Sequence, residues 1–250
     1  MRRGASAIVA LALAGCVAPA PAPSTPPPTP AATAASPLAG SAAPTEPPAE
    51  APRTRFAGRV RAPLPRSVRR ELRGSTWRPG CPVRLADLAL LRFNHVGFDG
   101  GIHRGRLVVH RSVAADVLGV FRRLFEARFP LERVDLAPRF RPHADPHTRR
   151  NVTAGFNCRP VITPEGPGTT FSQHAYGLAV DVNPLQNPYV AADGSVRNRF
   201  ARPYADRTLD RPGMIHEGDV VVRAFEAIGW AWGGRWSGAK DFMHFSSTGR

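Results

Sequence analysis

Two histidines and one aspartate in the C-terminal half of the chain have the residue types and surroundings of a metal site. His174 follows a turn-rich stretch, and Asp181 stands on the polar face of an otherwise apolar strand. A carboxylate among apolar side chains costs several kcal/mol unless it is paired or binds a cation. His244, between Met243 and Phe245, supplies a second imidazole. Two imidazoles and a carboxylate with an open fourth position are typical of a catalytic zinc site.

A further carboxylate lies three residues before the second histidine. Asp241 is close enough to His244 in sequence to act as a general base at such a site. Side chains three apart on a regular strand point to opposite faces, so Asp241 and His244 cannot share one face of one strand. We therefore expect Asp241 in the turn just before the last strand. Taken singly, His174 could be a hydrogen-bonded loop histidine and Asp181 a capping or ion-paired residue; the joint pattern favours the metal site.

Two segments carry a resemblance to a known family. Residues 172–181 read Ser-Gln-His-Ala-Tyr-Gly-Leu-Ala-Val-Asp, and residues 241–245 read Asp-Phe-Met-His-Phe. Together they resemble the zinc D-alanyl-D-alanine carboxypeptidase family, which includes D,D-peptidases of vancomycin resistance and L-alanyl-D-glutamate endopeptidases of phage lysins. The similarity runs from about Val83 to Phe245 and includes the segments 156–159 and 229–234.

The resemblance implies a function and a role for each matching residue. The implied Zn²⁺ ligands are His174, Asp181 and His244. Asp241 would be the general base, where many relatives have Glu, Arg159 would polarise the scissile carbonyl, and Ser172 would contact substrate. The expected reaction is hydrolysis of peptide bonds in peptidoglycan stem peptides by metal-activated water, as a D-Ala-D-Ala carboxypeptidase or an L-Ala-D-Glu endopeptidase. The alternative is a cell-wall-binding module whose zinc is only structural.

The elements that must position these residues follow from hydrophobic patterning. We expect strands at 88–98, 106–110, 134–136, 178–183 and 242–245. We expect helices from Ser112, as N-cap, to about Phe129 and from Asp219 to Ile228, the second stopped by Gly229. Strands and helices interleave without regular βαβ spacing. The predicted fold class is therefore α+β, a small, mostly antiparallel sheet with flanking helices and the zinc site on the sheet.

The first 53 residues predict export and anchoring. Arg2 and Arg3 precede an apolar run that is too short to cross a bilayer, which is typical of a secretory signal. Residues 13–16, Leu-Ala-Gly-Cys, resemble a bacterial lipobox, although an ordinary signal with a chance cysteine would look similar. We expect a lipoprotein signal peptide at 1–15, then a lipidated Cys16 and a Pro/Ala-rich, disordered tether to residue 53. An N-terminal arm (54–82) and the zinc peptidase domain (83–250) follow.

The cysteines bear on the redox environment of the protein, and the net charge bears on the class of partner that it binds. An exported, oxidising location favours a disulfide between Cys81 and Cys158, whereas a shared metal site is disfavoured because neither has a C-x-x-C partner.

The chain has 34 Lys+Arg against 19 Asp+Glu, a net charge of +15. These cations are nearly all scattered arginines, so we expect no nucleic acid partner. The expected partners are stem peptides and, through the lipid on Cys16, the membrane. We expect a monomer in the cell envelope, anchored on the periplasmic side or the cell surface.

Overall fold

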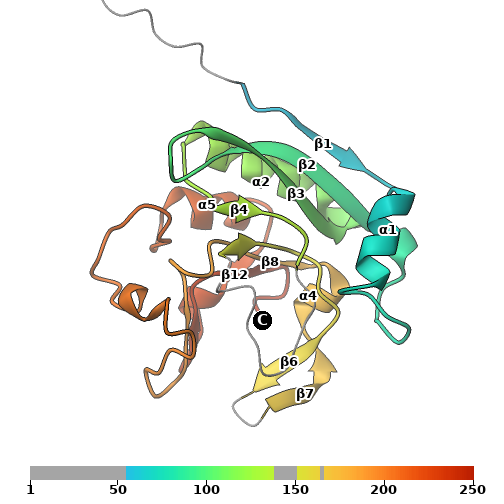
Figure 1. The fold of residues 1–250 in the computed structure, drawn as a ribbon. Helices are drawn as coiled ribbons and strands as arrows, with labels where there is room; N and C mark the ends of the chain where they lie inside the picture. Colours follow the sequence, from blue (N-terminus) through green and yellow to red (C-terminus); the bar gives the residue numbers. More distant parts are fainter. Residues whose placement is uncertain (1–54, 138–150, 164–165) are drawn as a thin grey trace, which may run out of the picture. The chain divides into compact units, whose positions relative to one another are not determined.

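The computed structural model describes residues 55–137, 151–163 and 166–250 (Figure 1). The expected signal peptide, Cys16 and the tether lie outside the described residues. The fold is α+β, with small and mostly antiparallel sheets, which confirms the predicted class. None of the helices within the described ranges is long and apolar enough to cross a membrane.

The described strands form two three-stranded sheets and three two-stranded pairs. The first sheet contains β1 (Gly58–Arg61), β2 (Leu88–Val96) and β3 (Ile102–His110), and the second contains β10 (Ala231–Trp232), β12 (His244–Ser246) and β8 (Ala179–Asp181). The pairs are β11 (Lys240–Asp241) with β9 (Tyr189–Val190), β6 (Pro160–Thr163) with β7 (Gly166–Phe171), and β4 (Arg133–Val134) with β5 (Val152–Thr153). Among these described pairings, only β4–β5 is parallel.

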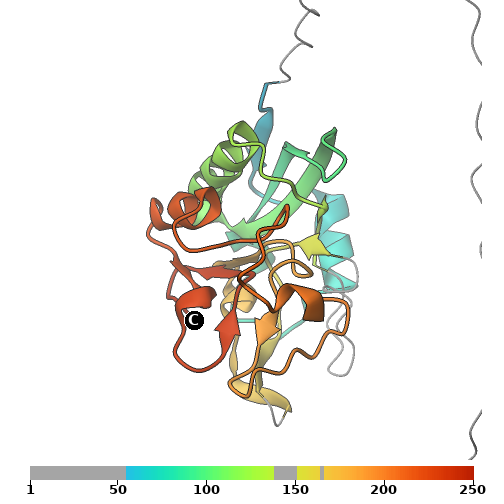
Figure 2. The ribbon, with the colours of Figure 1, turned by 90° about the vertical axis from the view of Figure 1, so that its left-hand side faces the viewer.

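Four α-helices accompany the sheets in the described part of the chain. They are α1 (Arg66–Arg73), α2 (Ala114–Glu126), α4 (Gln173–Tyr176) and α5 (Val220–Glu226). Short 3₁₀ segments lie at η1 (Leu85–Asp87), η2 (Arg111–Val113), η3 (Arg202–Tyr204) and η4 (Gly233–Arg235). The β6–β7 hairpin projects from the domain beside α4 (Figures 1 and 2).

The alternation of β2 divides the interior into two cores. Leu91 and Phe93 belong to a core that α2 and α5 complete, and these two helices lie side by side in Figure 2. Leu88 and Leu90 point to the other face of the strand and pack with α1. Phe245 of β12 also lies in the first core, with Val180 and Val182 of the β8 segment. The second sheet is therefore attached to the first through buried apolar side chains, and its opposite face is left for polar residues.

Several boundaries differ from those predicted. The expected N-cap of the first long helix is wrong, because Ser112 lies within η2, its hydroxyl is hydrogen-bonded to His110, and α2 begins only at Ala114. The described part of the arm contains β1 and α1, which its weak pattern does not predict. Of the strand predicted at 242–245, only His244 and Phe245 are in a strand, β12, while 242–243 form the turn that separates β12 from β11. By contrast, the helix predicted at 219–228 is present as α5, and Asp219 caps it.

A disulfide joins the arm to the second core. Cys81 and Cys158 are bonded, with their Cα atoms 5.9 Å apart, as expected from the sequence. Cys158 is buried, and its carbonyl accepts a hydrogen bond from Arg78 Nη1 at 2.7 Å. The bridge therefore holds the start of the β6–β7 hairpin, and with it Arg159, against the arm.

Candidate metal centre

His174 is placed by a single turn of helix. The hydroxyl of Ser172 accepts a hydrogen bond from the His174 N–H at 3.4 Å and so caps α4. The helix ends at Gly177, which has a φ of +70°. A side chain there would lie 2.5 Å from the backbone nitrogen of His110, so only glycine allows α4 to lie against β3. His174 is thereby held at a buried position, with 2 % of its surface exposed.

Asp181 and His244 are brought together by strand register. They are directly opposed across the antiparallel β8–β12 pair. Their strand neighbours Val180 and Phe245 face the core, so the two polar side chains share the opposite face. The backbone of Asp181 is also bonded to Ala154 in both directions, at 2.9 and 3.0 Å. The backbone next to Ala154 thus lies close to the site, where Gly155 contacts His174.

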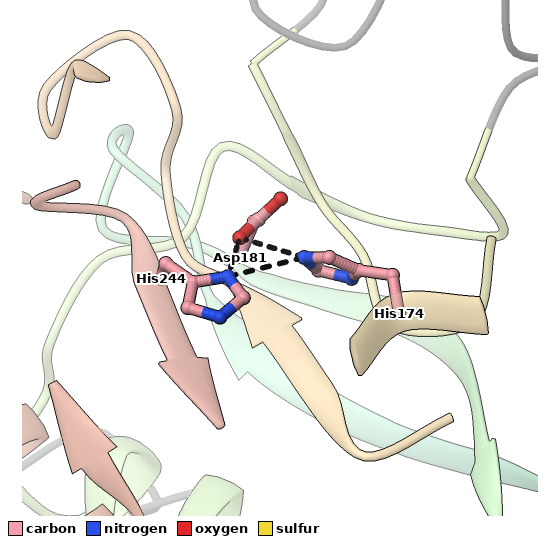
Figure 3. A group of neighbouring side chains, drawn as sticks. All are labelled: His174, Asp181 and His244. Carbon is pink, nitrogen blue, oxygen red and sulfur yellow. Dashed lines mark hydrogen bonds and ion pairs between the residues drawn. The ribbon is translucent and has the colours of Figure 1, made fainter. Parts of the chain in front are cut away.

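The three side chains converge on one another (Figure 3). We call His174, Asp181 and His244 the His/Asp/His cluster. Asp181 Oδ1 lies 3.1 Å from His174 Nε2 and 3.1 Å from His244 Nδ1, and the two ring nitrogens are 3.2 Å apart. In a tetrahedral zinc site with bonds of about 2.0–2.1 Å, ligand atoms are about 3.3–3.4 Å apart. The cluster therefore has the dimensions of one face of such a site.

The outer nitrogens of both rings are occupied by backbone carbonyls. His174 Nδ1 donates to the carbonyl of Gly155 at 2.7 Å, and His244 Nε2 donates to the carbonyl of Arg250 at 3.2 Å. A carbonyl can only accept, so each ring donates from its outer nitrogen, and its inner nitrogen faces Asp181, where it can carry a proton or offer a lone pair to a metal ion. Outer-nitrogen bonds of this kind are typical of metal-ligating histidines. Two inner nitrogens and a carboxylate oxygen thus form a donor set that suits a cation.

Electrostatics agree with an arrangement that attracts positive charge. Burial alone would raise the pKa of Asp181, but His174 and His244 outweigh it and hold the pKa well below its usual range. Burial lowers the pKa of His174. Burial also opposes protonation of His244, but the Asp181 carboxylate outweighs it, and the pKa of His244 is raised. The carboxylate is therefore ionised at neutral pH, and two nitrogens and one oxygen suit zinc.

Asp241 lies at the end of β11, one turn away from His244. The expectation that Asp241 lies in the turn itself is wrong, because Asp241 is a residue of β11. The turn at 242–243 separates it from His244, and this removes the strand-face conflict in the sequence. The charge of Asp241 adds to the rise in the pKa of His244 and, after burial, to that of Tyr189, its partner across β9–β11. Gly233 lets this turn approach, because a Cβ there would lie 2.6 Å from the Asp241 carbonyl oxygen.

Arg159 and Ser172, predicted to meet substrate, lie beside the cluster. Arg159 is half-buried at the start of the β6–β7 hairpin, and its carbonyl accepts from the Ser172 N–H at 3.1 Å. Its charge contributes, after burial, to the lowered pKa of His174. The structure thus brings a cation near one ring of the cluster, and it shows Ser172 as the cap of α4.

The sequence analysis misses a half-buried cation that contacts the turn between Asp241 and His244. The guanidinium of Arg207 lies 4.3 Å from the ring centroid of Phe242, in that turn. Arg207 also donates to the carbonyls of Gln186 and Ile215, at 2.9 and 2.5 Å. Burial lowers the pKa of Arg207 to about 10. No spacing in the sequence signals this contact, because Arg207 is one of many arginines and its partners are mostly backbone atoms.

Comparison with known proteins agrees with the site. Residues 165–247 match the model of a peptidase family described as D-alanyl-D-alanine carboxypeptidase. This is a third of the 250-residue chain, a shorter range than the similarity expected from the sequence, and it extends from the residue before β7 to the residue after β12. It includes the His/Asp/His cluster, Ser172 and Asp241, whereas Arg159 lies before it. Neither the curated proteins nor the solved structures contain a significant match to the chain.

Proposed function

We propose that this chain is a zinc-dependent peptidase that hydrolyses a peptide bond in the stem peptides of peptidoglycan. The observation that carries the proposal is the convergence of two inward-facing imidazole nitrogens and a carboxylate oxygen at 3.1–3.2 Å. The matching family model supports a peptidase, and its description supports the substrate class. We take the bond between two terminal D-alanines as the first candidate on that description.

The side chains around the cluster suit hydrolysis by water. His174, Asp181 and His244 would hold Zn²⁺, which when bound supplies a Lewis acid and a water acidic enough to ionise near neutral pH. Asp241 takes a proton from the attacking water and returns it to the leaving amine. Arg159 stabilises the negative charge that develops on the carbonyl oxygen. The Ser172 oxygen accepts from His174, which leaves its O–H to donate to substrate.

The place of action belongs to the same proposal. A lipid on Cys16 would hold the enzyme at a membrane of the cell envelope, and residues 17–53 would let it reach the wall. Labelled fatty acid should enter the wild-type chain and fail to enter the Cys16→Ser variant. Equal labelling of both chains would contradict the anchor without affecting the proposed chemistry.

The decisive experiment digests purified muropeptides with the zinc-loaded chain and identifies the products by mass spectrometry. We expect loss of one alanine from pentapeptide stems. Release of whole stems would instead identify an L-Ala-D-Glu endopeptidase. A chelator should abolish the reaction, zinc should restore it, and penicillin should have no effect because no acyl-enzyme forms. Absence of any product from a zinc-loaded chain would overturn the proposal and favour the wall-binding module.

A further inference from the structure

The last two residues of the chain lie against the metal centre. The carbonyl of Arg250 accepts two hydrogen bonds, from the hydroxyl of Ser246 at 2.8 Å and from His244 Nε2 at 3.2 Å. The carbonyl of Gly249 accepts from the indole nitrogen of Trp236 at 2.6 Å. The marked end of the chain accordingly lies near β12 in Figure 1. We call residues 249–250 the C-terminal clasp.

The two imidazoles of the cluster are held in unequal ways. His174 bonds to the carbonyl of Gly155, which is buried and whose neighbour Ala154 is bonded to β8 on both its backbone groups. His244 bonds to the main-chain oxygen of Arg250, which is an exposed residue. The acceptor for His174 is therefore part of the packed interior. The acceptor for His244 belongs to an exposed residue that is held by the Ser246 hydroxyl and, through Gly249, by the Trp236 indole.

The ring of His244 also contacts the residue that holds the clasp. The rings of Trp236 and His244 have centroids 5.5 Å apart, and the same indole donates to Gly249. Ser246, two residues along β12 from His244, is fully buried and bonds to the same Arg250 carbonyl. Ser246 and, through Gly249, Trp236 thus hold the Arg250 carbonyl where it can accept a hydrogen bond from His244 Nε2.

We propose that the C-terminal clasp positions His244 as a metal ligand by keeping its proton on Nε2 and its Nδ1 lone pair directed at the cluster. The proposal rests on the proposed zinc site and names the part of the chain that sets its affinity. A neutral imidazole without an outer acceptor can take the other tautomer or rotate. Loss of such an outer partner typically weakens metal binding by about 10–100-fold.

The test compares zinc affinity, measured by competition with a chelating dye, in the full chain and in a variant that lacks Gly249 and Arg250. We expect the deletion to weaken binding by about 10–100-fold, while the zinc-free melting temperature changes by no more than a few degrees. Ser246→Ala should give a smaller loss in the same direction. Ser247→Ala is the matched control, because Ser247 is exposed and contacts Leu178 through its backbone alone in the described structure; its affinity should be unchanged.

A second measurement separates positioning from general loosening. In the zinc-loaded full chain, the His244 Nε2 proton should exchange slowly with water in proton–nitrogen spectra, and in the deletion variant it should exchange fast. Should the deletion prevent folding, Trp236→Phe keeps an aromatic ring beside His244 and removes the bond to Gly249. It should then weaken zinc binding and speed the same exchange.

The outcomes distinguish this proposal from the proposed function. The clasp is overturned if the deletion variant binds zinc within about threefold of the affinity of the full chain, even if the enzyme hydrolyses stem peptides. Where the deletion variant does not fold, the same criterion applies to Trp236→Phe. If the variants bind zinc more weakly but the full chain does not hydrolyse stem peptides, the clasp is supported and the proposed peptidase function is overturned. A full chain that binds no zinc overturns both.

Discussion

Asp241 is the residue whose proposed role as general base can be tested most directly by a single substitution. It is separated from His244 only by the turn at 242–243, and its charge contributes to the raised pKa of that histidine. It is not part of the His/Asp/His cluster, because the three clustered donor atoms come from other residues. Its chemistry can therefore be removed without removing a proposed metal ligand.

Asp241→Asn should lower kcat/KM on a stem pentapeptide by about 10²–10⁴-fold, because general acid–base catalysis typically contributes that much. Zinc content, measured by elemental analysis, should stay that of the wild type. The exposed Asp210→Asn is the control and should change neither quantity. Wild-type turnover in Asp241→Asn would show that another group moves the proton.

The residues of the cluster could be named from the sequence, but their outer partners could not. Asp181 and His244 are identifiable because their residue types are uncommon on apolar strands, and His174 joins them because the two segments resemble a family. The acceptors at Gly155 and Arg250 are backbone carbonyls, which every residue has. Only the fold determines which carbonyl meets which ring, so no residue type signals it.

The close approach of η4 to β11 and β12 fixes the position of Asp241, the proposed base. Gly233→Ala would add a Cβ only 2.6 Å from the Asp241 carbonyl oxygen and 3.3 Å from the His244 Cβ. Overpacking of this kind costs about 1–3 kcal/mol and is relieved by backbone movement. We expect kcat/KM to fall at least tenfold, with a lower melting temperature. Gly119→Ala, with no atoms within 4 Å of the added Cβ, should raise the melting temperature slightly and keep activity.

Asp135 links three elements and makes stability depend on pH. Its oxygens lie 2.5 Å from Arg106 Nε of β3 and 2.6 Å from Arg133 Nη2 of β4, and Arg106 also bonds to Glu71 of α1. Burial works to raise the pKa of Asp135, but Arg133, the Leu136 N–H and Arg106 outweigh it and lower the pKa. The ionised carboxylate therefore stabilises the fold above the unfolded pKa of about 3.9, and this contribution is lost as pH falls through the lower folded value.

Asp135→Asn should lower the free energy of unfolding by about 1–3 kcal/mol at neutral pH, since bonds to charged groups are lost. Melting temperatures followed from pH 7 to pH 2.5 should show the largest gap between wild type and variant above pH 5. The gap should close below the folded pKa, where the wild-type carboxyl is also neutral. A gap that persists or widens in acid would contradict the assigned role.

The long elements were predictable and the short ones were not. The β2–β3 hairpin, α2 and α5 follow from periodicity because each presents a regular apolar face to the first core. By contrast, α1 buries only Val68 and Leu72 among arginines, and every residue of β1 is exposed, so neither has a readable pattern. The break between β11 and β12 follows from tertiary pairing with β9 and β8, which lie far away in the sequence.

For the whole molecule, the disulfide is the one covalent tie between distant described segments. Cys81 and Cys158 are 77 residues apart, and closing a loop of that length restricts the unfolded chain strongly. Changing both to Ala should lower the free energy of unfolding by about 2–5 kcal/mol. Denaturant titrations check this, and a reductant should bring the wild type to the variant's midpoint while leaving the variant unchanged. A reductant effect on the variant would show that the bridge is not the cause.

The faces of β8 and β12 also bear on how the protein behaves when metal is scarce. Val180 and Phe245 anchor these strands in the core, and no member of the His/Asp/His cluster belongs to it. We expect the chain to fold without the ion, so that the metal-free protein keeps a preformed binding site. Under the proposed function, hydrolysis would then depend on the zinc available to the folded chain, and activity would return with the ion without new protein synthesis.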